Sequence, residues 1–378
     1  MSDAVHSAAE TAEEHAAALL AAAVRAADGR HPGAGASLSA LIRPEHYKLS
    51  EVERLTVRRL LKGLVETVEA DLRARLLNAG ALPDVEEFTA SLGAAHVAIA
   101  WPMLSQSGLP DDRALAELLV RRSRTFAIGR QLRRNAVSTE NGRLETLTDH
   151  GDDAIAADAM DLLIAESRTN DRFDDPKVMR SDLSDPSDRQ LVWTVAAALR
   201  RYGVQLHGIE PSALDPAIAD TTTAMLGDRG DMRSLEGIAM QLAGRLHRAD
   251  LADDALLVET LNSARLTLYV ALLAARGDLP FGVAWEMAVL PDAPSHMLLL
   301  KSLGVAREAA SHLLVAMTRA LLADDRLADE RAAEWVQSYD RLQPADIERA
   351  MRSWRLDRDY RDAIAALRGR SFSERGVS

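Results

Sequence analysis

Apolar residues recur every three or four positions along most of the chain, which is the spacing of one face of an α-helix. The clearest case lies between residues 50 and 80, where Ser50-x-x-Glu53 is a capping box and Gly80 is a typical helix stop. Ten apolar residues lie between them: Leu55, Val57, Leu60, Leu61, Leu64, Val65, Val68, Leu72, Leu76 and Leu77. We expect a helix of roughly 29 residues, about 43 Å long. Two interpretations stay open for this helix 51–79, packing within its own domain or pairing with a second copy in a homodimer.

The same spacing predicts helices in the rest of the chain, beginning with residues 1–30, 138–148 and 153–166. In the second half we expect helices at about 186–202, 212–227, 234–248, 252–276, 281–290, 293–303, 305–323, 327–340, 344–353 and 356–368. No segment alternates in the manner of a β-strand. The pattern therefore predicts an all-α fold of stacked antiparallel helix pairs, resembling a HEAT-like α-solenoid with two subdomains.

The stretch 94–134 is the most informative local pattern. Pro102 is expected to kink or stop a helix, because proline lacks the N–H group and collides with the preceding turn. Gly108 to Asp111 then form a turn with an acidic N-cap, and an apolar stripe follows at 115–120. A second, arginine-rich helix is expected over 121–134.

Composition shifts suggest the domain boundaries. Residues 1–40 are expected to form an N-terminal helix and a flexible linker, whose glycines lack the Gly-Lys-Ser/Thr that a phosphate loop needs. Residues 41–170 form an N-terminal helical-repeat domain, and 190–378 a C-terminal one. Between them, 171–189 carries six aspartates and two prolines, which predicts an acidic linker that is partly ordered at best.

Composition narrows the class of protein. Of 378 residues, 47% are hydrophobic and only 4% are aromatic, which suits close-packed helices. The net charge of −12 argues against nonspecific nucleic-acid or anionic-membrane binding by the whole molecule. There is no cysteine, which rules out disulfides and thiolate chemistry. We expect no membrane span, no ordinary secretory signal and a cytoplasmic location.

The arginine-rich helix reverses the charge of this acidic chain. No acidic residue occurs between residues 121 and 139, and six arginines fall within 14 positions: Arg121, Arg122, Arg124, Arg130, Arg133 and Arg134. One interpretation is an anion site for a phosphate, a nucleic-acid backbone or an acidic partner segment. The other is pairing with the acidic helix starts at 111–112 or 152–153.

Four aromatic residues near the C-terminus form a second candidate surface: Trp335, Tyr339, Trp354 and Tyr360. Together with neighbouring arginines they can form a partner-binding groove, since Trp, Tyr and Arg dominate protein interfaces. Alternatively, they cap the helical stack with large side chains.

Candidates for catalysis are weak. The ten histidines show no metal-binding spacing, and His150 beside Asp149 and Asp152 is better explained by a polar turn. The carboxylate pairs lie at expected helix starts, and the serines lack a nucleophile elbow. We expect no catalytic residue, no metal and no cofactor, and therefore no enzyme.

Two segments resemble a known family. They are LSEVERLTVRRLLKGLVETVEADLRARLL (49–77) and HVAIAWPMLSQSGLPDDRALAELLVRRS (96–123), followed by the turn at Gly151-Asp152. They are similar to uncharacterised, mostly alphaproteobacterial proteins that share a domain of unknown function with HEAT-like helical repeats. The likeness covers roughly 45–170 and ends locally after Ser123, where 125–129 replaces the family's histidine motif. It implies a fold and a bacterial cytoplasmic setting, and it carries no activity.

These patterns together favour a non-enzymatic helical-repeat protein that serves as a protein-binding or regulatory scaffold, with the partner unknown. The alternative is anion or nucleic-acid binding through 121–134. An enzyme of unknown type is the third hypothesis.

Overall fold

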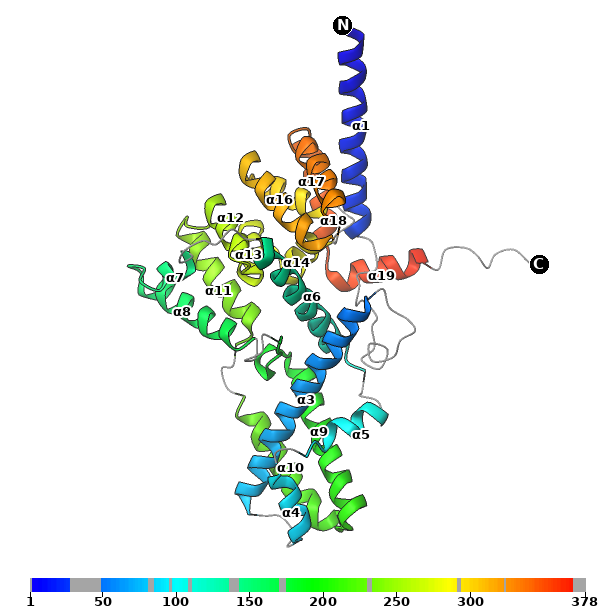
Figure 1. The fold of residues 1–378 in the computed structure, drawn as a ribbon, viewed down its shortest axis with the longest axis vertical. Coiled ribbons are helices and arrows are strands. Elements are labelled where there is room, and N and C mark those ends of the chain that lie inside the picture. Colours follow the sequence, from blue (N-terminus) through cyan, green and yellow to red (C-terminus); the bar gives the residue numbers. More distant parts are fainter. Residues whose placement is uncertain are drawn as a thin grey trace, which may run out of the picture. The chain divides into compact units, whose positions relative to one another are not determined.

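A computed structural model describes residues 2–27, 49–80, 85–94, 97–107, 111–135, 143–169, 175–229, 233–290, 294–322 and 324–369. Across these ranges the chain forms α-helices, one short 3₁₀-helix and no β-strand, which confirms the all-α prediction (Figure 1). The chain divides into two compact units, and neither is one continuous stretch. Unit 1 contains residues 1–31, 125–164 and 236–378, and unit 2 contains residues 32–124 and 165–235.

Unit 2 is built around α3 (Glu51–Ala79), the helix that the sequence predicts most clearly. The Ser50 side chain accepts from the Glu53 amide, the Glu53 carboxylate accepts from the Ser50 amide at 2.7 Å, and Gly80 ends the helix at φ 61°. The capping box and the glycine stop are therefore confirmed. The other elements are α4 (Glu86–Gly93), α5 (Ala100–Ser107), the 3₁₀-helix η1 (Arg180–Asp182), α9 (Asp185–His207) and α10 (Pro211–Gly227).

The apolar stripe of α3 forms the centre of the unit 2 core. Leu61, Val65 and Val68 are completely buried, and α3 contacts α4, α5, α9 and α10 (Figure 1). Burying a leucine or valine side chain contributes about 1.5–3 kcal/mol, so this one helix supplies much of the driving force for folding unit 2. The inner face of α3 is used within its own unit, whereas homodimerisation through this helix stays a prediction.

Unit 1 contains most of the remaining helices. They are α1 (Ser2–Ala27), α7 (Arg143–Leu147), α11 (Leu235–Arg248), α12 (Asp254–Asn262), α13 (Leu266–Gly277), α14 (Phe281–Val289), α15 (Ser295–Ser302), α16 (Arg307–Leu321), α17 (Asp325–Tyr339), α18 (Pro344–Trp354) and α19 (Arg358–Gly369). Every residue of α13 from Leu266 to Ala274 is buried. Helix α1 packs on α18, where the Trp354 indole N–H donates to the Ala23 carbonyl oxygen at 3.2 Å.

Helices α6 (Arg113–Asn135) and α8 (Asp153–Ser167) contribute residues to both units, because the division falls after Arg124 and after Ile164. The sequence predicts a separate basic helix over 121–134, but α6 is a single helix of 23 residues. No helix breaker separates the apolar stripe of 115–120 from the arginines that follow it. The prediction of a separate helix over 121–134 was therefore wrong.

Two other local predictions differ from the structure. Pro102 neither kinks nor stops a helix, because α5 begins at Ala100 and places the proline in its first turn, where no backbone hydrogen bond is lost. The helix expected over 252–276 is broken into α12 and α13 by Ala264, whose φ is 56°. An alanine in this conformation is held by its surroundings, so the break has no local sequence signal.

The acidic segment 171–189 also differs from its prediction in its described part. Residues 175–189 contain η1 and the first turn of α9, which begins at Asp185 behind a Ser184 cap. The boundaries predicted at 171–189 and at residue 40 do not match the division into units, since each unit combines segments that lie far apart in sequence. The end of the helix predicted over 1–30 and the flexible linker predicted before residue 41 lie outside the described residues.

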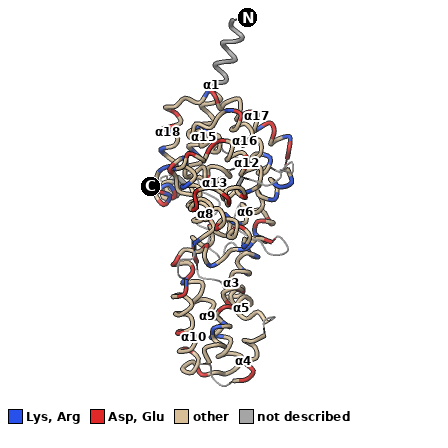
Figure 2. The backbone as a smooth tube through the Cα atoms, turned by 90° about the vertical axis from the view of Figure 1, so that its left-hand side faces the viewer, with Lys and Arg blue, Asp and Glu red and all other residues tan. Residues whose placement is uncertain are grey.

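The HEAT-like repeat stays a prediction. A solenoid places each repeat against its neighbours only, whereas here α1 contacts α18, and α3 contacts α9 and α10. In the described ranges, no single helix has the length and apolar character to cross a membrane, although α13 and α14 together, bent by 115°, meet that criterion. Acidic and basic residues are interspersed along the helices of both units (Figure 2).

Candidate functional site

A buried ion pair lies on the inner face of α3 in unit 2. Glu69 and Arg73 are one turn apart, and they continue the row of inward residues that begins with Val57, Leu61 and Val65. Arg73 Nη1 lies 3.0 Å from Glu69 Oε1, with only 8% and 3% of the two side chains exposed. A buried pair is stable only where further hydrogen bonds replace lost water. The surrounding backbone supplies those bonds.

Arg73 ends α4. Its Nε donates to the Leu92 carbonyl at 2.8 Å, and its Nη2 donates to the carbonyls of Ser91 at 2.8 Å and Ala94 at 2.6 Å. Nη1 reaches the Val97 carbonyl at 2.6 Å as well as Glu69. All five N–H groups of the guanidinium therefore have partners. The last carbonyls of a helix lack partners within the helix, so a buried cation is well suited to this position.

Glu69 begins α5. Its Oε1 accepts from the Ile99 amide at 3.0 Å, and its Oε2 accepts from the Ala100 amide at 2.8 Å. These are free amides at the positive end of the helix dipole, where a carboxylate is favoured. One ion pair on α3 therefore fixes the end of α4 and the start of α5.

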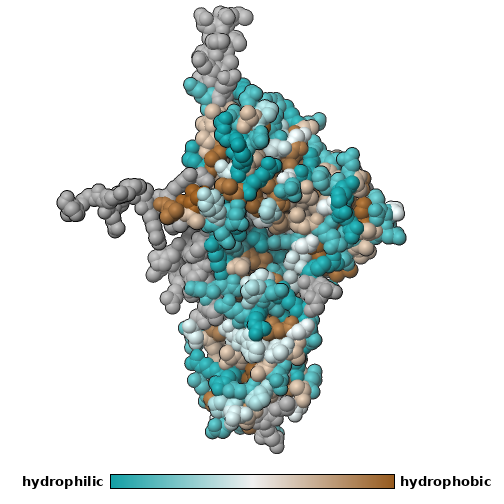
Figure 3. All heavy atoms as spheres, turned by 180° about the vertical axis from the view of Figure 1, so that it is seen from behind, coloured by the Kyte–Doolittle hydropathy of each residue, from teal (hydrophilic) through white to brown (hydrophobic). Residues whose placement is uncertain are grey.

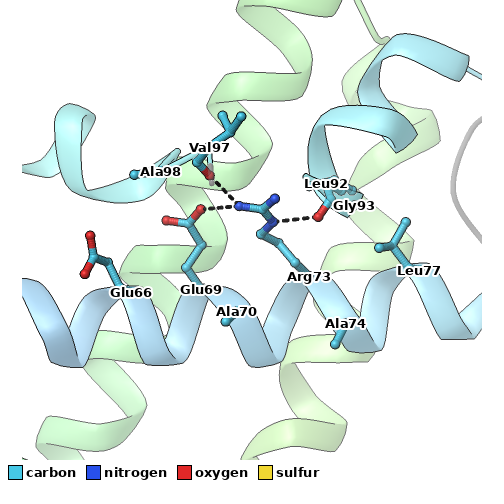
Figure 4. Close-up of a pocket in the computed structure, with 10 residues that line it drawn as sticks. All are labelled: Glu66, Glu69, Ala70, Arg73, Ala74, Leu77, Leu92, Gly93, Val97 and Ala98. Carbon is cyan, nitrogen blue, oxygen red and sulfur yellow. Dashed lines mark hydrogen bonds and ion pairs between the residues drawn. The ribbon is translucent and has the colours of Figure 1, made fainter. Parts of the chain in front are cut away.

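A groove of about 480 Å³ lies beside this pair, and we call it the α3 groove (Figure 4). Its lining residues are Glu66, Glu69, Ala70, Arg73, Ala74, Leu77, Leu92, Gly93, Val97 and Ala98. Ala70 and Ala74 are exposed on α3, whereas Glu69 and Arg73 are committed to the chain's own groups. The Glu66 carboxylate is accessible and lies 3.6 Å from the Lys62 ammonium. The groove therefore offers a ligand small apolar side chains and one acidic group at its margin.

The sequence patterns did not predict the α3 groove. A signal was present, because Glu69 and Arg73 occupy two consecutive positions of a helix row that is otherwise apolar. Charged residues spaced four apart on an inward face indicate a buried pair. Their partners, the backbone groups of 91–100, depend on tertiary packing and have no sequence signal.

The six arginines proposed as an anion site divide between the units. Arg122 lies 3.1 Å from Asp182, buried, and Arg124 lies 2.9 Å from Glu53. Neither partner was among the acids expected at 111–112 or 152–153. Arg121, which also belongs to unit 2, has an interaction with its surroundings. Local interactions thus account for the first three of the six arginines.

Arg130, Arg133 and Arg134 belong to unit 1 and are exposed. The Arg130 guanidinium lies over the Phe126 ring at 5.8 Å, and Arg134 donates to Gln131 at 3.5 Å. Arg133 also has an interaction with its surroundings. These three arginines are the exposed members of the six, whereas Arg121 and Arg124 are half-buried and Arg122 is buried.

The predicted aromatic groove is not brought together as an open surface. Trp335, Tyr339 and Trp354 are 3%, 2% and 0% exposed, and only Tyr360 reaches solvent, at 58%. The Tyr339 hydroxyl donates to the Val305 carbonyl at 2.6 Å. Three of the four residues therefore fill the interior of unit 1, because large aromatic side chains bury the most apolar area.

The aspartates of 175–189 are paired with arginines from other elements of unit 2. Asp188 is 1% exposed and accepts from Nε and Nη2 of Arg180, each at 2.8 Å, and Arg229 Nη1 lies 3.4 Å from it. Asp175 binds Arg59 at 2.6 Å. Because these charges are neutralised locally, an aspartate-rich segment takes a defined conformation here.

A buried Tyr–His pair lies in unit 1. The Tyr269 hydroxyl and His296 Nε2 are 2.7 Å apart, and both side chains are almost fully buried. Burial lowers the pKa of His296 from 6.5 to about 3 and raises the pKa of Tyr269 well above its usual value. The imidazole is therefore neutral at physiological pH, and the pair contributes a hydrogen bond to the core of the unit.

In the part of the chain that the structure describes, no group of three or more His, Asp or Glu residues is arranged to hold a metal ion. His150 lies in the polar turn expected for it, where its Nδ1 accepts from the Asp152 amide at 3.0 Å.

Comparison with models of protein families finds a match over residues 99–352, to a family described as an uncharacterised protein conserved in bacteria (DUF2336). Neither the comparison with curated proteins nor that with solved structures found a match. The matched range covers more than half of the chain and begins after the α3 residues that line the groove.

Proposed function

This chain belongs to the uncharacterised bacterial family DUF2336, and we propose that it is a non-enzymatic helical-repeat protein that binds another protein in a regulatory or scaffold role. The proposal includes a cytoplasmic setting. The observation that carries it is the α3 groove, whose charged residues are committed internally while its accessible surface is largely apolar.

The groove fits a peptide segment better than a reacting small molecule. Arg73 uses all five donors on its own chain and Glu69 uses both oxygens, so their capacity for ligand binding or proton transfer is already occupied. Ala70 and Ala74 are one turn apart, and their small side chains allow a close approach of another backbone. A volume of about 480 Å³ accommodates several apolar side chains.

The chemistry of the groove defines the partner segment. We expect an amphipathic segment that places leucine-sized side chains against Leu77, Leu92 and Val97. A basic side chain in the same segment would lie near the Glu66 carboxylate, which is 43% exposed. A rigid groove favours such binding because it loses little conformational freedom on association. The Glu69–Arg73 pair holds both walls of the groove in place.

A photoreactive amino acid introduced at position 70 or 74 tests this proposal in the native host. We expect one protein to be cross-linked from both positions and identified by mass spectrometry. The same group at Ala213, an exposed alanine on α10 that does not line the groove, is the matched control. If positions 70 and 74 capture nothing beyond what position 213 captures, the groove is not a protein-binding site.

Anion binding by α6 is the second candidate, and the exposure of Arg130 and Arg134 supports it. Such binding is expected to weaken with salt, because counterions compete for arginines. The test is titration of an oligonucleotide at low salt, with Arg→Ala changes at 130, 133 and 134. Binding that survives the triple change, or no binding by the wild type, would exclude this candidate.

A further inference from the structure

Two large apolar side chains at the start of α3 are exposed, although this helix forms the centre of the unit 2 core. Val52 is 73% exposed and Leu55 is 57% exposed. Eighteen residues make five full turns of a helix, so Val52 points in the same direction as Ala70. For the same reason Leu55 points in the direction of Arg73, which reaches the end of α4 beside the α3 groove. Val52 and Leu55 therefore lie on the groove side of α3, nearer its N-terminal end.

The outward side of α3 changes from large to small side chains along its length. We call it the α3 outer face and define it as Val52, Leu55, Arg59, Gly63, Glu66, Ala70 and Ala74. The large apolar side chains lie at its start, and the two alanines line the groove at its other end. Seen from the side opposite to Figure 1, the surface of unit 2 shows hydrophobic atoms only in scattered spots (Figure 3). Scattered apolar residues are ordinary, whereas the outer face combines apolar projections with a hollow that can receive such projections.

Gly63 is the midpoint of the outer face, eleven residues after Val52 and eleven before Ala74. It is exposed, and a Cβ added there would have no described atom within 4 Å. A glycine inside a helix costs stability relative to alanine, and neither the helical backbone nor a close contact in the described chain requires one at this position. A glycine does allow another backbone to approach closely. The position therefore suits the crossing point of a second helix.

An antiparallel pair of two α3 helices, with its two-fold axis at Gly63, matches the two ends of the outer face. Residues equally far from Gly63 then lie opposite each other, so Val52 lies opposite the other copy's Ala74. Leu55 lies opposite position 71, between the two alanines of the groove. Because the axis brings the same flank of both helices together, Leu55, which points as Arg73 does, faces the α4 wall of the other copy's groove. The two-fold axis repeats this contact, so each copy fills the groove of the other.

The distribution of charge favours the same register. Glu66 is three residues after Gly63, and the basic residues Arg59 and Lys62 are four residues and one residue before it. In the antiparallel pair, Glu66 of each copy lies between these two basic residues of the other, offset along the helix axis by about 1.5 Å and about 3 Å. The side chains of Arg59, Lys62 and Glu66 are 60%, 49% and 43% exposed, although Arg59 also contacts Asp175 at 2.6 Å. Parallel pairing would place like charges opposite each other, which is unfavourable.

We propose that the partner filling the α3 groove is a second copy of this chain, paired through the α3 outer face as an antiparallel helix that crosses at Gly63. This inference rests on the proposed function of the groove as a protein-binding site, and it names the partner. The chain itself carries the segment that the groove requires, because Val52 and Leu55 supply the apolar side chains and Arg59 supplies the basic one near Glu66. The contact involves one helix of each copy, so we expect a weak, reversible dimer.

Sedimentation velocity over a concentration series tests the pairing. We expect a reversible dimer for the wild type, with a dissociation constant raised at least tenfold by Gly63→Leu or by Leu55→Arg. Gly63→Leu should not lower the melting temperature, because the single chain has open space there and leucine favours a helix. Leu206→Arg, at a leucine of α9 that is 65% exposed, is the matched control and should leave the dimer intact. A wild-type chain that is monomeric at all concentrations, or a dimer that both α3 variants leave unchanged, would overturn the proposal.

Disulfide trapping tests the register, because the natural chain has no cysteine. Two single variants, Val52→Cys and Ala74→Cys, are prepared with different tags and mixed under mild oxidation. Antiparallel pairing predicts that the mixed 52–74 disulfide forms faster than either homodisulfide. Predominant 52–52 and 74–74 disulfides would indicate parallel helices and contradict the proposed geometry, and equal yields with Leu206→Cys would contradict it by showing random collision.

Photo-crosslinking from position 74 separates this inference from the proposed function on which it rests. The native host carries two differently tagged copies of the chain, one of them with the photoreactive amino acid. A cross-link to residues 52–55 of the other copy supports both proposals. A cross-link to a different protein, together with a monomeric wild type, supports a protein-binding groove and overturns self-association. No cross-link beyond that obtained from position 213 overturns both.

Discussion

Glu69 and Arg73, 3.0 Å apart on one helix, hold the ends of two other helices, since Arg73 binds the last carbonyls of α4 and Glu69 binds the first amides of α5. A pair that joins three helices is expected to matter far more for stability than one exposed on a helix surface.

Arg73→Met is expected to destabilise the protein by about 3–5 kcal/mol, because it leaves a buried carboxylate without its countercharge and several carbonyls without donors. Urea denaturation followed by circular dichroism measures the change. The control is Arg326→Met, which removes an i,i+4 partner of Glu330 at an exposed position and should cost less than about 1 kcal/mol. Equal losses in the two variants would mean that burial of the Glu69–Arg73 pair has no special effect.

Asp188→Asn is expected to lower the free energy of unfolding by a similar amount, about 3–5 kcal/mol, because Arg180 and Arg229 lose a buried countercharge. Limited proteolysis should then cut within 175–189 faster than in the wild type. Asp215→Asn is the matched control, since Asp215 also takes two donors of one arginine, Arg200, but at an exposed position. If both variants behave alike, the ordering of this segment does not depend on Asp188.

His296 is expected to make stability dependent on pH. Its pKa in the folded protein is about 3, below the usual 6.5, so the unfolded chain binds a proton that the folded protein excludes. Stability is therefore full above pH 6.5 and falls as the pH decreases toward 3, by about 1.4 kcal/mol per pH unit from this residue.

Denaturation of the wild type and of His296→Gln at pH 7 and pH 5.5 measures this effect. Glutamine keeps a polar partner for Tyr269 and does not titrate, so the variant should lose that part of the pH dependence. Exposed carboxylates titrate mainly below this range, which separates their effect from that of the histidine. An unchanged slope in the variant would contradict the assignment.

Ser50→Ala is expected to destabilise α3 by about 1 kcal/mol, because the first turn loses the hydroxyl that accepts from the Glu53 amide. The control is Ser311→Ala, where the lost hydroxyl donates back to the Arg307 carbonyl within a helix, and the change should be neutral or slightly stabilising. Thermal denaturation monitored at 222 nm compares the two.

Local chemistry explains which parts of this fold the sequence predicts. Ser50, Glu53 and Gly80 define the limits of α3 through contacts within four residues, so the prediction needed no knowledge of the tertiary structure. The break at Ala264 and the ordering of Asp188 depend on distant residues, and they were not predicted. The same is true of the candidate surfaces. The inward position of Trp335 and Tyr339 and the outward position of Tyr360 are set by packing, and periodicity alone does not separate an inner face from an outer one.

The interleaved order of the two units has a consequence for synthesis on the ribosome. The last residue of unit 2 is 235. Helix α1 docks on α18 only after Trp354 has been made, which is 331 residues after its partner Ala23. At about 5–20 residues per second, this wait lasts roughly 17–66 seconds. Unit 2 can therefore complete its core while α1 still lacks its docking site, so α1 is buried only after a later-made part of the chain has already folded.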